Sequence, residues 1–125
     1  VLPEIISKEP LGPVVRQGDD QWFNIVRWTL NALINAEEMG ITKANAEARL
    51  KGTKNPAIKR LLGGEGKFGE ELGLSNDWAL NAITAVGNYG ESYERNVGPN
   101  TPLKLDRGVN ALWSNGGILY AAPIR

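Results

Sequence analysis

The segment Val14–Leu30 constrains the fold of this chain most strongly. It predicts a short β-branched strand over Val14–Arg16, a Gly-Asp-Asp turn, and then a strongly apolar helix. Asp19 and Asp20 suit the N-cap of that helix because their carboxylates accept its first unpaired backbone N–H groups. The apolar stripe repeats at helical spacing at Trp22, Ile25, Val26, Thr29, Leu33 and Ala36. Three further residues widen it: Phe23, Leu30 and Ile34.

A helix with so broad an apolar stripe needs cover on more than one side. A strand that leads directly into such a helix is one half of an α/β unit, and we expect the other half upstream of Val1. The segment therefore predicts a piece of a larger α/β protein.

Composition restricts the classes of function. The 125 residues form at most one ordinary domain, and a hydrophobic share of 42% with a charged share of 22% is typical of a soluble globular protein. Fourteen basic residues balance fourteen acidic ones without clustering, which argues against nucleic acid as a partner. The chain has neither cysteine nor histidine, which excludes disulfides, thiolate zinc sites, a cysteine nucleophile and a histidine base. No apolar stretch approaches the roughly 20 residues of a membrane span.

Glycines, prolines and capping residues divide the rest of the chain into helices. Gly87 and Gly90 interrupt one of these helices and predict a kink or a close helix contact there. We expect extended structure at Val1–Ile6, Val14–Arg16 and Ile118–Ile124, and a loop over 64–73 with one short turn around Phe68. The five expected helices run over about 20–39, 42–51, 56–62, 75–93 and 105–113.

Paired carboxylates are the remaining candidates for acid–base catalysis. Glu37–Glu38 stand near a helix end and Glu70–Glu71 in a polar loop, and we interpret both pairs as solvated surface. Glu91 and Glu94 flank Tyr93, which is only loosely similar to a glycosidase cleft. We therefore assign no catalytic residue.

Two further patterns are explained by structure rather than by function. The glycine-rich segment Gly63–Gly69 lacks Walker spacing and follows no strand, so we interpret it as a flexible connector rather than a phosphate cradle. The cations Lys59, Arg60 and Arg107 form no motif. Tryptophans can stack on sugars or bases, but here each one lies on a predicted helix at core spacing, which favours core or interface packing. The tryptophans are Trp22, Trp28, Trp78 and Trp113.

Several stretches carry a family resemblance in the order in which they occur: Leu2–Pro13, Asp19–Phe23 with Ile25–Leu30, Val86–Glu91, Arg107–Trp113 and Tyr120–Arg125. Together they resemble the carboxyl-terminal part of a solute-binding protein of polar amino-acid ABC transporters, of the general L-amino-acid-binding periplasmic type (solute-binding protein family 3). The long helical extension after Gly40 separates this subgroup from the shorter glutamine- and histidine-type binders.

The resemblance implies a two-lobed α/β architecture, the type II periplasmic binding protein, which closes on its ligand by hinge motion. Residues 1–18 would form a crossing segment and a strand of the amino-terminal lobe. Residues 19–125 would form a helix of that lobe and a helical carboxyl-terminal extension, together one partial domain. We expect the chain itself to be mostly α with two or three short strands.

The resemblance also implies a non-enzymatic protein of the periplasm, without a cofactor or metal, that delivers L-amino acids to an ABC permease of the inner membrane. The arginine and aspartate that clamp the ligand in this family lie upstream of Val1, so no residue of this chain is assigned to ligand binding. The helix over Trp22–Ile34 would contact the missing amino-terminal part or, without it, a second copy of the chain.

Two alternative functions stay open at this point. One is an independent helical interaction module that buries its tryptophans against a partner. The other is a small carboxylate-dependent hydrolase, which would need a convergent carboxylate pair in a cleft.

Overall fold

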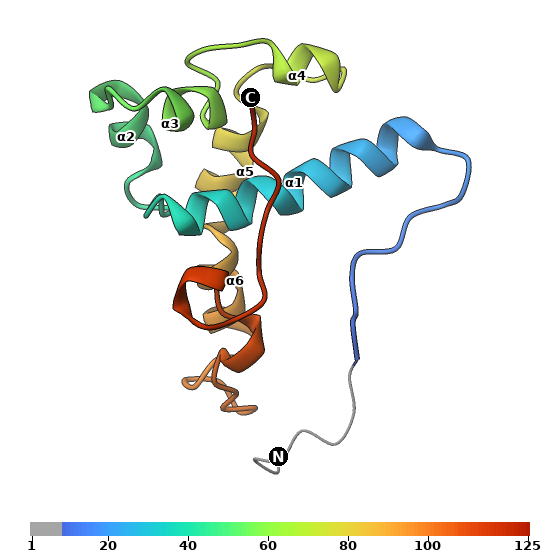
Figure 1. Cartoon of the computed structure of the whole chain (residues 1–125), viewed down its shortest axis with the longest axis vertical. Helices are drawn as coiled ribbons and strands as arrows, with labels where there is room; N and C mark the ends of the chain where they lie inside the picture. Colours follow the sequence, from blue (N-terminus) through green and yellow to red (C-terminus); the bar gives the residue numbers. More distant parts are fainter. Residues whose placement is uncertain (1–8) are drawn as a thin grey trace.

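The computed structural model describes residues 9–125 and consists of helices arranged around one long central helix, α1 (Figure 1). Helices α5 and α6 contact one side of α1, and the final segment of the chain crosses its other side. The elements are α1 (Asp20–Glu38), α2 (Ala46–Gly52), α3 (Pro56–Leu61), α4 (Phe68–Glu71), α5 (Trp78–Val86) and α6 (Tyr89–Asn96), with short 3-10 turns η1 (Gly108–Asn110) and η2 (Trp113–Asn115).

Local capping chemistry fixes the ends of α1 where the sequence predicts them. The carboxylate of Asp19 accepts the backbone N–H of Trp22 at 3.0 Å, which satisfies one of the unpaired donors of the first turn. At the other end Met39 is the C-cap, and Gly40 follows with φ of +64°. That left-handed conformation costs glycine little, so the chain turns away from the helix there.

Asparagines cap two further helices. Asn55 accepts from Ala57 N–H, and Pro56 occupies the first turn of α3, as predicted. Asn88 and Glu91 form a reciprocal capping box at the start of α6. The helix predicted over 75–93 is therefore two helices, because this box begins a new helix directly after the Gly87 turn.

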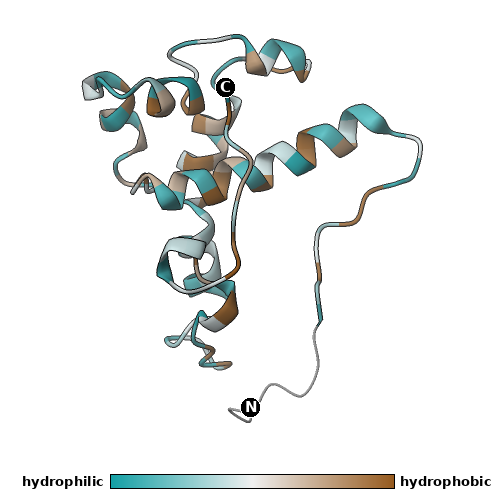
Figure 2. Ribbon diagram, viewed as in Figure 1, coloured by the Kyte–Doolittle hydropathy of each residue, from teal (hydrophilic) through white to brown (hydrophobic). Residues whose placement is uncertain are grey.

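The hydrophobic core lies where the second half of α1 meets α3 and α5 (Figure 2). An aromatic run joins α4 to this core: the Phe68 ring lies 4.7 Å from that of Trp28, edge to face, and 6.1 Å from that of Trp78. The buried apolar side chains of this core are Ala32, Ala36, Ile41, Ala46, Ile58, Leu61, Leu62, Leu72, Trp78, Ala79, Ile83 and Ile124.

The expectations about the strands and about the start of the second helix are wrong. Val14–Arg16 is not a strand; Val14 is 94% exposed, and no strand in the described part of the chain pairs with it. Within residues 9–125 there is no strand at all, only an isolated parallel bridge between Leu112 and Leu119. The second helix begins at Ala46 rather than at 42, because the side chain of Asn45 accepts from Thr42 N–H and closes a turn before it.

The helix expected over 105–113 is also absent from the structure. Lys104 and Gly108 have positive φ angles of 51° and 48°, which no α-helix tolerates, and Leu105 N–H donates to Val97 O instead. Only η1 and η2 form there. The segment over 118–124 is non-helical, as predicted, whereas the expected extended structure over Val1–Ile6 lies outside the described residues.

Candidate functional site

The amino-terminal half of α1 presents an exposed aromatic surface. It projects beyond the other helices (Figure 1), and Trp22 and Phe23 are 51% and 47% exposed. Leu11 and Val14, in the segment before the helix, are exposed as well. We call these four residues the open face. Large exposed apolar side chains of this kind mark an interaction surface.

The second half of α1 is covered instead. Ala32, Ile34 and Ala36 are buried by the helices that follow in the sequence and by the final segment. The predicted broad apolar stripe is thus only partly covered: Ile25 and Trp28 in the first half of α1 also pack against the core, whereas Trp22 and Phe23 at its start stay about half exposed.

The final segment crosses α1 as a strap, residues 119–124. Asn35 Nδ2 donates to Ala122 O at 2.8 Å, and Ala122 N–H donates to Asn31 Oδ1 at 2.9 Å. Two asparagine side chains on α1 thus satisfy the main chain of one strap residue, as a neighbouring strand would. Two side chains of the strap itself, Ala121 and Ile124, are buried.

The Glu37–Glu38 pair is not uniformly solvated surface. Glu37 forms a bidentate ion pair with Arg107, whose Nη1 and Nη2 lie 2.8 and 3.1 Å from its carboxylate oxygens. The Arg107 guanidinium also lies 5.5 and 5.2 Å from the rings of Tyr89 and Tyr93. Arg107, which the sequence left without a role, therefore anchors the chain after α6 to α1. Glu38 is exposed.

The other carboxylates are single residues with structural contacts or exposed positions. Glu70 accepts from the Asn76 side chain, and Glu71 is exposed. Glu91 accepts the backbone N–H groups of Asn88 and Lys43, and Glu94 is exposed. This arrangement offers no support for the hydrolase hypothesis, which requires two carboxylates that converge on a cleft.

The glycine-rich segment serves close backbone packing. A Cβ atom at Gly63 would lie 2.2 Å from Asn76 O, and one at Gly69 would lie 2.3 Å from Ser75 O. The chain on either side of this loop therefore approaches a neighbouring backbone too closely for any side chain. Lys59 forms an exposed ion pair with Glu65.

The tryptophans divide between core and surface. Trp78 is buried and Trp28 packs against the core, as predicted. Trp22 and Trp113 are 51% and 52% exposed, and Trp113 lies on the turn η2 rather than on a predicted helix. Over residues 9–125 no three acidic side chains gather in a cluster that could hold a metal ion. No helix in this range is long and apolar enough to cross a bilayer.

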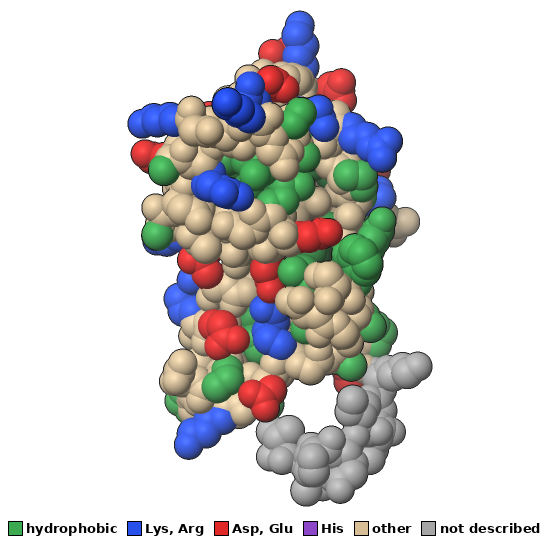
Figure 3. Space-filling model, turned by 60° about the vertical axis from the view of Figure 1, so that its left-hand side comes forward, with side chains coloured by type: hydrophobic (Ala, Val, Ile, Leu, Met, Phe, Trp, Pro, Cys, Tyr) green, Lys and Arg blue, Asp and Glu red, His purple; other side chains and the backbone are tan. Residues whose placement is uncertain are grey.

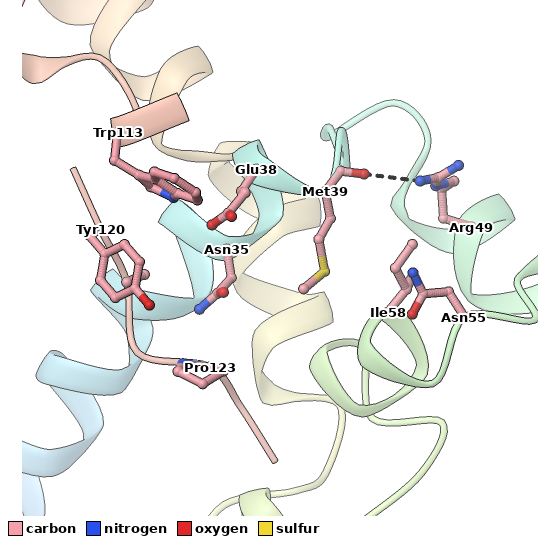
Figure 4. Close-up of a pocket in the computed structure, with 10 residues that line it drawn as sticks. Asn35, Glu38, Met39, Arg49, Asn55, Ile58, Trp113, Tyr120 and Pro123 are labelled. Atoms are coloured by element: carbon pink, nitrogen blue, oxygen red, sulfur yellow. Dashed lines mark hydrogen bonds between the residues drawn. The ribbon is translucent and has the colours of Figure 1, made fainter. Parts of the chain in front are cut away.

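A pocket of about 500 Å³ lies at the carboxyl-terminal end of α1 (Figure 4). Its lining comes from four parts of the chain: the end of α1, helices α2 and α3 with the loop between them, the turn η2, and the strap. Trp113 and Tyr120 stand together on one wall with their ring centroids 5.8 Å apart, edge to face. The lining residues are Asn35, Glu38, Met39, Arg49, Asn55, Ile58, Trp113, Tyr120, Ala121 and Pro123.

Comparison with solved structures defines the class of protein. Over 99% of its length the chain matches an ABC transporter periplasmic binding protein from Brucella ovis with glutathione bound, with a TM-score of 0.92, 59% identity and coverage of 39% of that chain. The chain thus has the fold of one part of a periplasmic binding protein. No family model matches the sequence.

Sequence relatives narrow this class. The whole chain is 65% identical to the general L-amino acid-binding periplasmic protein AapJ of Rhizobium johnstonii and 60% identical to the putative amino-acid ABC transporter-binding protein YhdW of Escherichia coli K12. It is 59% identical to the glutamate/glutamine/aspartate/asparagine-binding protein BztA of Rhodobacter capsulatus. The chain spans 37% of the length of each of these relatives.

The chain therefore corresponds to the carboxyl-terminal part of the periplasmic binding proteins of amino-acid ABC transporters. The resemblance drawn from the sequence motifs is confirmed. The expected location in the periplasm is that of these relatives.

Proposed function

We propose that the chain is part of the solute-binding component of an ABC importer for amino acids. In this role the complete protein captures an L-amino acid in the periplasm, without chemical conversion, and delivers it to a permease of the inner membrane. The identity of 59–65% over the whole chain to amino-acid-binding relatives carries this proposal.

The structure supports a contribution to architecture rather than to ligand chemistry. An α-amino acid is held by charged partners that converge in a cleft. In the described residues the best-formed bidentate pair, Glu37–Arg107, is satisfied internally, and Glu91 is occupied by backbone donors. We infer that the residues that clamp the ligand lie upstream of Val1.

The open face fits the same proposal. More than half of the length of each relative lies outside the part that this chain matches. We infer that the upstream part covers Trp22 and Phe23, so that α1 joins the ligand-binding lobe to the helical extension.

Isothermal titration calorimetry tests the proposal. The chain alone is titrated with a panel of L-amino acids, and so is the same chain extended upstream to the length of its relatives. Glutathione belongs in the panel because the structural neighbour holds it. We expect binding by the extended protein and none by the chain alone.

Two results would contradict the proposal. Micromolar binding by the chain alone would place the site within these 125 residues. An extended, folded protein that binds no amino acid would remove amino-acid capture as the function.

A further inference from the structure

We propose that the pocket at the carboxyl-terminal end of α1 binds an organic cation, a guanidinium or alkylammonium group, between Glu38 and the aromatic pair Trp113–Tyr120. This second site is separate from amino-acid capture by the complete protein and does not depend on it.

The geometry supplies the first support. In Figure 4 the Glu38 carboxylate is directed toward the wall that carries the Trp113 and Tyr120 rings, while Arg49 lies on the opposite side of the pocket. Met39 lies between these two sides and provides an apolar floor. A cation beside Glu38 would therefore contact a carboxylate and an aromatic ring at once.

The charges at this end of α1 supply the second support. The last turn of α1 contains no basic residue and carries two glutamates, although the negative end of a helix dipole favours cations. Glu37 is neutralised by Arg107. Glu38 has no ion-pair or hydrogen-bond partner among residues 9–125. A bound cation would offset both the free carboxylate and the helix end.

Three other polar side chains of the lining already make hydrogen bonds. Asn35 Nδ2 donates to two backbone carbonyls, and Asn55 caps α3. Arg49 Nη2 donates to Met39 O at 3.0 Å. Glu38 is the one carboxylate of this lining, and it is therefore the group that would pair with a cation.

The aromatic pair supplies the third support. Trp113 and Tyr120 are 52% and 72% exposed, although each offers a large apolar ring. Rings of this kind attract a cation through the negative charge of their faces, and tryptophan does so most strongly. The pocket volume of about 500 Å³ is that of a small-molecule site or of a site for one side chain of a partner.

Solution NMR tests the proposal through the indole N–H of Trp113. The probe is N-acetyl-arginine amide, which carries a guanidinium and no carboxylate, and the matched neutral probe is N-acetyl-citrulline amide. We expect a saturable shift of the Trp113 indole signal with the arginine probe, with a dissociation constant on the order of 1 mM, and no saturable shift with citrulline. The dispersed amide spectrum of the chain serves as the check of folding.

Variants identify the residues that carry binding. Glu38→Gln keeps the shape and removes the charge, and we expect the dissociation constant for the arginine probe to rise roughly fivefold. Tyr120→Leu should weaken binding as well while the Trp113 reporter stays in place. The control Glu71→Gln removes an exposed carboxylate elsewhere, on α4, and should leave the dissociation constant unchanged.

The outcomes separate clearly. Equal shifts with arginine and citrulline probes, no shift with either, or unchanged binding by Glu38→Gln would each overturn the proposal. A capped Ala-Arg-Ala peptide distinguishes the source of the cation. Tighter binding of the peptide than of the single-residue probe indicates a side chain of a partner protein, and equal binding indicates a free small cation.

Discussion

Arg107 holds together parts of the molecule that are far apart in the sequence. Its guanidinium donates to both carboxylate oxygens of Glu37, and its Nη2 also donates to Asn110 O at 2.9 Å. The side chains of this ion pair are only 19% and 16% exposed. Removal of one partner would leave the other charge in a poorly solvated place.

We expect Arg107→Ala to lower the free energy of unfolding by about 2–4 kcal/mol. Lys59→Ala is the matched control, because it breaks an ion pair with Glu65 whose side chains are 37% and 45% exposed. That change should cost less than about 1 kcal/mol. Urea unfolding monitored by circular dichroism measures both, and equal losses would contradict the anchoring role of Arg107.

Asp77 gives a prediction of pH dependence. Hydrogen bonds from the side chains of Ser75 and Asn81 hold the pKa of the Asp77 carboxyl below its ordinary value of 3.8. Because the folded pKa is the lower one, ionised Asp77 contributes stability above its unfolded pKa, and this contribution is lost as the pH falls through the folded pKa.

We expect Ser75→Ala to raise the pKa of Asp77 toward 3.8, since the Ser75 hydroxyl is the largest cause of the shift. NMR titration of the Asp77 side-chain signals measures the change. Ser114→Ala, in the turn η2, is the control and should leave the titration midpoint of Asp77 where it is. A midpoint of Asp77 at or above 3.8 in the unaltered chain would show that these hydrogen bonds do not persist in solution.

The role of a single residue could be predicted only where its partner is close in the sequence. The Asp19 cap joins residues three positions apart, and the pattern around it predicts the contact. Glu37 and Arg107 are 70 positions apart, and neither belongs to a motif. Their pairing depends on the packing of α6 and the following loop against α1, which no local pattern encodes.

Among the elements, the strap is held to α1 by hydrogen bonds from its main chain to side chains of the helix, whereas a strand in a sheet would bond to the main chain of its neighbour. Asn31 and Asn35 project from one face of α1, four residues apart, and both bond to Ala122. This spacing places the two amides on the same side of the helix. The strap therefore has a fixed register along α1.

We expect Asn31→Ala to speed hydrogen exchange at the Ala122 amide and to lower the free energy of unfolding by about 1–2 kcal/mol, because this N–H loses its acceptor. Asn96→Ala is the control: that exposed side chain donates to Ser92 O within α6. Its loss should leave the exchange of Ala122 unchanged. Equal exchange rates of the Ala122 amide in the two variants would contradict the hydrogen bond from this amide to Asn31.

At the scale of elements, helices with strong local signals were predicted and the others were not. Asn55-Pro56 specifies the start of α3 by itself. The apolar residues over 105–113 have helical spacing, but no helix forms there. Gly108 has a positive φ, and Leu105 N–H donates to Val97 O. A strand over Val14–Arg16 needs a partner strand, so its β-branched residues alone do not produce one.

The whole molecule has two kinds of surface. Positive and negative side chains are interspersed over the face that Figure 3 shows, in agreement with the balanced charge of the sequence. The open face consists of exposed apolar side chains instead. The family resemblance predicted that the helix over Trp22–Ile34 contacts an upstream part, but in the structure only the start of that range is exposed, and Ile34 is buried.

We expect the isolated chain to self-associate through the open face, since burial of apolar surface is worth about 25 cal/mol per Å². The double variant Trp22→Ser, Phe23→Ser should shift the chain toward monomer in sedimentation velocity experiments. Trp113→Ser is the matched control, because Trp113 is exposed to the same extent but lies outside the open face.

A well-dispersed monomer at high concentration in the unaltered chain would contradict this expectation. In that case the chain would be a self-sufficient domain, and the hypothesis of an independent interaction module would gain support. Restored dispersion on addition of the upstream part would favour the assignment to a binding protein.

The strap also sets an order of events during folding. Its clamp on Ala122 joins residues 91 positions apart, whereas α5 and α6 are neighbours along the chain. Closing so long a loop costs more conformational entropy than closing a short one, and distant contacts form slowly for that reason. We expect the helices to assemble first and the strap to dock last. Until then Asn31 and Asn35 on α1 would stay available to any extended chain, which makes this late step the point at which two copies can exchange their final segments.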